Sequence, residues 1–267
     1  MPDSRFFRNV CLSDALLRVR SLRPPRAFYR DLLGLRFVTS SARRTEFSAN
    51  GHRPALLVLE EHPKDEDRAP GSPGLFHLAF LFPDREAIAT ATSRLVSRNY
   101  PLRGASDHGV SEAIYLADPE GNGLELYADR PAKVWPQNGA FVKMFTRRLD
   151  LQELLSRAVP TRDDYSIPPE TRLGHLHLNV VSLEQTESLL RNKLRIDVRQ
   201  RDVPGALFFG YDGYHHHLAA NTWDIRSGAR QGVVGLESFT VRITPELASG
   251  VSEVILDGMY LRVLPLG

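Results

Sequence analysis

The chain of 267 residues repeats itself at an offset of 161 positions. Sliding the sequence by that distance aligns six apolar or arginine positions without a gap: Val19, Leu22, Arg30, Leu33, Leu35 and Phe37 with Val180, Leu183, Arg191, Leu194, Ile196 and Val198. The same offset carries Gly74-Leu75 onto Gly235-Leu236. A register kept over about sixty residues is hard to obtain by chance. It predicts two duplicated domains, at residues 1–130 and 173–267, joined by a linker at 131–172 that carries one helix.

Each half is predicted to contain two units with the element order β-α-β-β-β. The strand and helix that open the first two units are expected at 15–19, 24–33, 75–82 and 85–98. Pro24 and Pro25 favour a helix start, and Gly34 favours its end. The last unit is truncated, because only residues 245–251 remain for its helix. The sequence therefore predicts an α+β fold of tandem βαβββ modules, with the last module shortened.

The segment from Gly104 to Arg130 contains the clearest hairpin of the chain. A strand at 111–116 is followed by the turn residues DPEGNG and by a second strand at 124–128. Alternation along that second strand points Glu125 away from its leucine neighbours and to the opposite face. A carboxylate on the concave face of a sheet is costly unless it is paired, and a metal ion is one such partner. The alternative interpretation is a solvent-facing strand glutamate.

Composition excludes several classes of protein. Hydrophobic residues make up 42% of the chain and charged residues 25%, which is typical of a globular protein. The net charge of +2 comes from scattered Lys and Arg, so nothing favours a nucleic-acid partner. Cys11 is the single cysteine, which excludes an internal disulfide framework. No secretory leader or membrane-spanning run is predicted, so we expect no membrane partner and a cytoplasmic location.

Several motifs resemble the vicinal oxygen chelate superfamily. They are FYRDLLGLRFV after the first strand, GLFHLAFLFP, DPEGNGLELY in the hairpin, and GYHHHLAANTW. The superfamily includes glyoxalase I, fosfomycin-resistance proteins, bleomycin-binding proteins and extradiol dioxygenases. The resemblance covers nearly the whole chain and is strongest to small two-domain bacterial catechol-2,3-dioxygenase-like proteins. It implies that pairs of units form cups whose first and last strands supply metal ligands.

The resemblance assigns metal ligands to three residues of the N-terminal half. They are His77, Glu125 and Asp14, whereas Val58 falls on the remaining ligand position and cannot bind a metal. The family usually has histidine where Asp14 stands. The set implies Fe(II) or Mn(II). Two carboxylates and one imidazole form a hard ligand set, which favours Mn(II) or another divalent ion. The alternative for His77, taken alone on its apolar strand, is a core histidine.

Two further residues of this half are expected beside the ion. Tyr115 precedes Glu125 by ten residues, as a tyrosine does in extradiol enzymes, and its phenol could donate to a substrate oxygen. His108 could donate a hydrogen bond or shuttle a proton. The alternatives are a packing aromatic for Tyr115 and a loop residue for His108.

The C-terminal half contains a competing histidine cluster. His175 takes the position of Asp14 plus 161, and alternation predicts that His177 shares its face. In the run at 215–217, His217 and His215 are predicted on one face and His216 on the other, so His175 and His217 form the competing metal site. Serine and arginine stand at the remaining ligand positions of this half, Ser238 and Arg262.

Three functions are compatible with these patterns. The first is a metal-dependent extradiol-type dioxygenase that cleaves a catechol-like aromatic with molecular oxygen. The second is another metal-assisted reaction on the same scaffold, such as an isomerase or lyase step. The third is a metal-free protein that sequesters a small aromatic or hydrophobic compound. The resemblance also implies a homodimer joined through edge strands.

Overall fold

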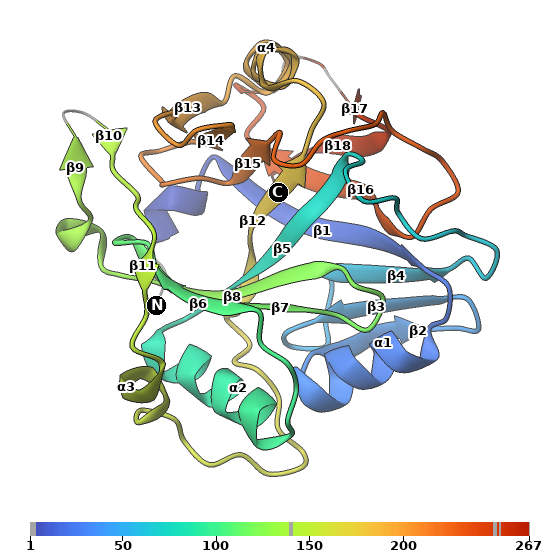
Figure 1. Cartoon of the computed structure of the whole chain (residues 1–267), viewed down its shortest axis with the longest axis vertical. Coiled ribbons are helices and arrows are strands. Elements are labelled where there is room, and N and C mark those ends of the chain that lie inside the picture. Colours follow the sequence, from blue (N-terminus) through green and yellow to red (C-terminus); the bar gives the residue numbers. More distant parts are fainter. Residues whose placement is uncertain (1–3, 139–140, 248–249, 251, 267) are drawn as a thin grey trace.

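The structure, a computed structural model, describes residues 4–138, 141–247, 250 and 252–266. It consists of two large mixed sheets with helices packed around them (Figure 1). The α+β class and the four repeated units are as the sequence predicts. Among the described residues, no helix is long and apolar enough to cross a membrane.

The first sheet has seven strands in the order β17-β18-β16-β1-β4-β3-β2. Their bounds are β1 Val10–Val19, β2 Arg36–Ser40, β3 Arg44–Ser48, β4 Leu57–Glu61, β16 Gly235–Ile243, β17 Glu253–Leu256 and β18 Met259–Pro265. This sheet joins the first unit of the chain to the last one, because β1 pairs antiparallel with β16.

The second sheet has nine strands in the order β11-β6-β7-β8-β5-β12-β15-β14-β13. Their bounds are β5 Gly74–Phe82, β6 Gly104–Asp107, β7 Ser111–Ala117, β8 Gly123–Asp129, β11 Arg147–Arg148, β12 Arg172–Asn179, β13 Asp197–Gln200, β14 Ala206–Gly210 and β15 Leu218–Asn221. Here β5 pairs antiparallel with β12, so the second and third units share one sheet. A separate short ribbon pairs β9 (Gln137–Asn138) with β10 (Phe141–Val142).

Each sheet thus draws one unit from each half of the chain. The predicted boundaries at 1–130 and 173–267 follow the sequence duplication, whereas the sheets combine units across it. Figure 1 shows β5 and β12 crossing the centre of the molecule, with helices α2 and α4 at opposite ends. The junction between the two halves therefore lies inside a sheet.

The helices begin where local signals predict. Helix α1 (Arg23–Ala27) starts with the proline pair and continues as a π-helical turn, Phe28–Leu32. The side chains of Asp84, Asp150 and Ser182 cap α2 (Arg85–Ser97), α3 (Leu151–Leu155) and α4 (Leu183–Leu194) by accepting from backbone N–H groups. Helix α3 is the helix expected in the linker. In the truncated unit, residues 245–247 form a turn, and positions 248, 249 and 251 lie outside the described residues.

Strand β5 separates two apolar clusters by its alternation. Leu78, Phe80 and Phe82 belong to the main core, which extends to the helices. Ala79 and Leu81 belong to a second cluster with Tyr127, Tyr214 and other aromatic residues. Since His77 shares its parity with Ala79, it projects into the concave side of the nine-stranded sheet.

Candidate metal centre

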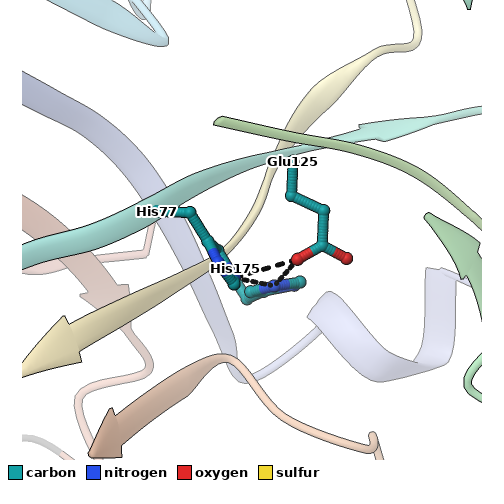
Figure 2. A group of neighbouring side chains, drawn as sticks. All are labelled: His77, Glu125 and His175. Carbon is teal, nitrogen blue, oxygen red and sulfur yellow. Dashed lines mark hydrogen bonds and ion pairs between the residues drawn. The ribbon is translucent and has the colours of Figure 1, made fainter. Parts of the chain in front are cut away.

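Three adjacent strands bring Glu125 and His175 to either side of one small residue. Ala79 on β5 pairs with Glu125 on the parallel strand β8, and with His175 on the antiparallel strand β12. His77 lies two positions before Ala79 and therefore on the same face. Figure 2 shows the three polar side chains converging from their strands.

The donor atoms of this group form a small triangle. Glu125 Oε2 lies 2.9 Å from His77 Nε2 and 3.1 Å from His175 Nε2, and the two imidazole nitrogens are 3.3 Å apart. Ligands about 2.1 Å from an ion and at right angles to each other are separated by about 3.0 Å. The triangle therefore fits one face of an octahedral divalent ion.

Burial and charge favour the metal-binding forms of Glu125 and His175. All three side chains are buried. Burial by itself raises the pKa of the Glu125 carboxyl, but the His175 and His77 rings beside it bring that pKa well below its usual range. Burial lowers the pKa of His175 to about 4. A carboxylate and neutral imidazoles are the forms that bind metals, and this two-histidine, one-carboxylate set is the facial triad of non-haem iron(II) oxygenases.

Asp14 is not brought to this group. It lies on β1, in the seven-stranded sheet, where its Oδ1 accepts a hydrogen bond from Thr240 Oγ1 at 3.2 Å. The prediction assumed that consecutive units share a cup. Because the second unit pairs with the third instead, His175 occupies the place expected for Asp14.

The seven-stranded sheet carries the equivalent positions without the ligands. Thr240 corresponds to Ala79 by the offset (79 + 161 = 240) and pairs with Arg262 as Ala79 pairs with Glu125. The position of His77 is taken by Ser238. Arg262 lies 3.8 Å from Glu253. Ser238 and Arg262 thus occupy the ligand positions of this sheet, as the sequence predicts, and neither side chain favours a bound cation.

Tyr115 and His108 stand next to the triangle. Tyr115 on β7 pairs with Glu125 on β8. Its hydroxyl lies 2.7 Å from His108 Nε2, and His108 Nδ1 lies 2.9 Å from the Phe145 carbonyl oxygen. The carbonyl can only accept, so Nδ1 carries the proton and Nε2 accepts from the phenol. Burial and then the Glu125 carboxylate raise the pKa of Tyr115 well above its ordinary value, so the phenol keeps its proton.

A cavity of about 360 Å³ opens over these groups. Its apolar walls are Phe76, Met144, Phe145, Val203, Phe208 and Trp223. Its polar lining consists of His77, Ser106, His108, Ser111, Tyr115, Glu125, Thr146, His175, His177 and His216. Among the described residues that line it there is no lysine or arginine, so no cationic side chain of the lining would pair with an anionic ligand.

Comparison with known proteins places this chain in a family. A model described as the Glyoxalase/Bleomycin resistance protein/Dioxygenase superfamily matches residues 12–126. A catechol-2,3-dioxygenase of Bacillus subtilis is 37% identical over 233 residues, which are 85% of this chain and 80% of the relative. The chain belongs to this superfamily. A biphenyl-2,3-diol 1,2-dioxygenase of Rhodococcus globerulus is 32% identical over 36% of the chain and 46% of its own length.

Solved structures agree with the superfamily fold. A structure from Bacillus subtilis aligns with a TM-score of 0.65 at 13% identity, over 97% of this chain and 86% of the other. Glyoxalase I from Zea mays aligns with a TM-score of 0.57 at 14% identity, over 96% and 92%. At these identities the likeness concerns the fold alone.

His217, the predicted partner of His175, is not among the described residues that line the cavity. His217 Nε2 donates to the Phe6 carbonyl oxygen at 3.0 Å, and its Nδ1 accepts from the Tyr211 N–H at 3.3 Å. Both ring nitrogens are thereby used inside the protein. His177 does share the face of His77, directly across from it, and its Nε2 accepts from Asn221 Nδ2 at 3.0 Å.

The residue of the run 215–217 that lies beside His175 is His216 and not the predicted His217. Strand β15 begins at Leu218, so the histidine run lies in the irregular segment before it, where alternation does not hold. His216 lines the cavity, and its ring centroid is 4.2 Å from that of His175. Gly213 precedes the run, and a glycine is a sequence signal for a turn. In the structure its φ is +79°.

Proposed function

We propose that the protein is a metal-dependent extradiol-type dioxygenase acting on a catechol-like aromatic. The observation that carries the proposal is the donor triangle of His77, Glu125 and His175 at the base of an apolar cavity. The named activity of the Bacillus subtilis relative supports it. A divalent ion held by these residues would supply the chemistry that joins dioxygen to a ring bearing adjacent hydroxyls.

The chain's own residues orient the substrate around that position. The Tyr115 hydroxyl and the His216 ring line the cavity and can form hydrogen bonds to hydroxyl groups of a substrate. His108 fixes the rotation of the Tyr115 phenol through the 2.7 Å contact. The aromatic walls formed by Phe208 and Trp223 exclude water and pack against a ring.

Two histidines and one carboxylate favour iron(II) over manganese(II) as the resident ion. Elemental analysis of protein purified anaerobically, without added chelator or an affinity tag that binds metal, should find iron near stoichiometry. Reconstitution with each ion separately, followed by turnover measurements, would show which ion supports the reaction. Protein that takes up neither ion would favour the alternative of a metal-free binding protein.

The reaction is tested with an oxygen electrode and catechol. One dioxygen should be consumed per catechol, with the carbon–carbon bond beside the diol broken and both oxygen atoms retained in the ring-opened product, as mass spectrometry would show. Glu125→Gln, which loses the charged ligand but keeps its shape, should abolish consumption. Metal uptake without oxygen consumption would favour the isomerase or lyase alternative.

The cavity lining points to neutral ring substituents. Burying a carboxylate without a cationic partner is costly, and Glu125 adds a like charge. We therefore expect kcat/KM for 3,4-dihydroxybenzoate to be at least about 100-fold below that for 4-methylcatechol. Similar values for the two compounds would contradict this substrate class without affecting the metal site.

The homodimer stays a prediction, to be tested by sedimentation.

A further inference from the structure

A chain of hydrogen bonds leads from Asp129 at the end of β8 to His216 in the cavity wall. Asp129 Oδ1 lies 3.0 Å from His215 Nε2, and His215 Nδ1 lies 2.8 Å from His216 Nδ1. The other carboxylate oxygen, Oδ2, accepts from Tyr214 Oη at 3.0 Å. Tyr214 in turn lies 2.9 Å from Tyr127 Oη. These hydrogen bonds link β8, the strand that carries Glu125, to the segment that carries His216.

The carboxylate sets the direction of every bond in this chain. An ionised Asp129 can only accept, so His215 Nε2 must carry a proton. When this is the only proton on the His215 ring, its Nδ1 is bare and accepts from Nδ1–H of His216. His216 is left with its proton on Nδ1 and a lone pair on Nε2. The tautomer of His216, a cavity residue, is thus determined by the Asp129 carboxylate, which reaches it through two hydrogen bonds.

Packing holds both rings in place. His215 lies between Tyr214 and Trp135, with ring centroids 4.0 Å and 5.3 Å away. His216 stacks 4.2 Å from His175 and lies 5.2 Å from Phe208. Both histidines are buried, which hinders ring rotation. The orientation of His216 is therefore fixed by its neighbours, and its tautomer is fixed by the hydrogen bonds from Asp129 through His215.

We infer that Asp129 and His215 are positioning residues that hold His216 with Nε2 as a hydrogen-bond acceptor toward a substrate hydroxyl. The role toward substrate rests on the proposed function, whereas the tautomer itself does not. Asp129→Asn is the sharpest probe because the side chain keeps its shape. With its Oδ1 toward Tyr214 the amide places Nδ2 toward His215 Nε2. In that orientation the amide donates to His215, reverses the direction of the hydrogen bonds and puts the proton of His216 on Nε2.

The first test is ¹⁵N NMR of the imidazole nitrogens in histidine-labelled protein loaded with Zn²⁺, a diamagnetic ion. In the natural sequence we expect His216 protonated on Nδ1 and His215 on Nε2. Both assignments should be exchanged in Asp129→Asn. Tyr214→Phe, which leaves the carboxylate intact, is the matched control and should leave both tautomers unchanged. A natural-sequence protein with the His216 proton on Nε2 would overturn the inference, even if the Asp129 variant failed to fold.

The second test is steady-state turnover of catechol by the iron-loaded protein. Asp129→Asn should lower kcat/KM about 10- to 100-fold with unchanged metal content, and Tyr214→Phe should not. Exchanged tautomers with unchanged kcat/KM would overturn the positioning role. A natural-sequence protein that cleaves no catechol would remove the proposed function while the tautomer result stands, so the two failures are distinguishable.

Discussion

Glu125 and His175 are 50 positions apart in the sequence, yet they flank the same residue, Ala79, and their Oε2 and Nε2 atoms lie 3.1 Å apart. Glu125 belongs to the N-terminal half of the sequence and His175 to the C-terminal half. They meet because β8 and β12 lie on opposite sides of β5 in one sheet. The site therefore requires both halves of the duplicated sequence.

The first prediction separates His175 from Asp14 as a metal ligand. His175→Ala removes one corner of the donor triangle, so bound metal should fall from near one ion per chain to a small fraction, at least about a 100-fold loss of affinity. Asp14→Ala, in the other sheet, is the matched control and should keep the ion. Elemental analysis after dialysis measures both. Loss of metal in the Asp14 variant alone would contradict the assignment.

The second prediction concerns the small residue between the ligands. Ala79 is fully buried, so the extra methyl groups of Ala79→Val would project between Glu125 and His175 and force them apart. We expect loss of metal together with a destabilisation of about 1–3 kcal/mol. Ala113→Val, buried in the same aromatic cluster but away from the ligands, should cost similar stability and retain metal. Equal metal content in the two variants would refute the argument.

The third prediction is a pH dependence of stability that His217 causes. Burial lowers the pKa of His217 from its ordinary 6.5 to about 3. The unfolded chain therefore binds a proton below about pH 6.5 that the folded chain does not, and stability falls as the pH decreases. Between pH 7 and pH 5 this contribution amounts to about 2 kcal/mol.

His217→Gln removes this titration. Its free energy of unfolding, measured by urea denaturation, should decrease less between pH 7 and pH 5 than that of the natural sequence. The difference should be about 2 kcal/mol. Because the other buried histidines are present in both proteins, their contributions cancel. Parallel pH profiles would show that His217 is not buried as a neutral ring.

The fourth prediction concerns the Tyr115 hydroxyl. Tyr115→Phe removes the phenolic group next to His108 and the cavity but no metal ligand. We expect kcat for catechol to fall about 10- to 1,000-fold while metal content stays the same. Tyr100→Phe loses a hydroxyl that donates to the Ala117 carbonyl outside the cavity, and it should keep full turnover. An equal loss in both variants would indicate a general structural effect.

Local sequence signals determined much of this protein. The helix start at the proline pair and the hairpin from Ser111 to Asp129 follow from residues close together in the chain. The selection of His77 and Glu125 as ligands came from the resemblance to the superfamily, and the structure brings the two side chains together. The repeat also placed Ser238 at the position of His77, and the alignment of GMYLRVLPL with GNGLELYAD placed Arg262 at the position of Glu125. Turn chemistry and strand alternation are local properties, and for that reason a single sequence reveals them.

The pairing of the units was decided only by the tertiary structure. Duplication makes the first unit resemble the third, so the sequence contains no local signal for whether β1 or β12 joins β5. That choice depends on how large apolar faces, distant in the sequence, bury one another, as β5 and β12 do through Leu78 and Leu176. It selected His175 over Asp14 as the third donor. It likewise turned His216 toward the cavity and His217 into the core, because the segment before β15 follows its tertiary contacts rather than a strand period.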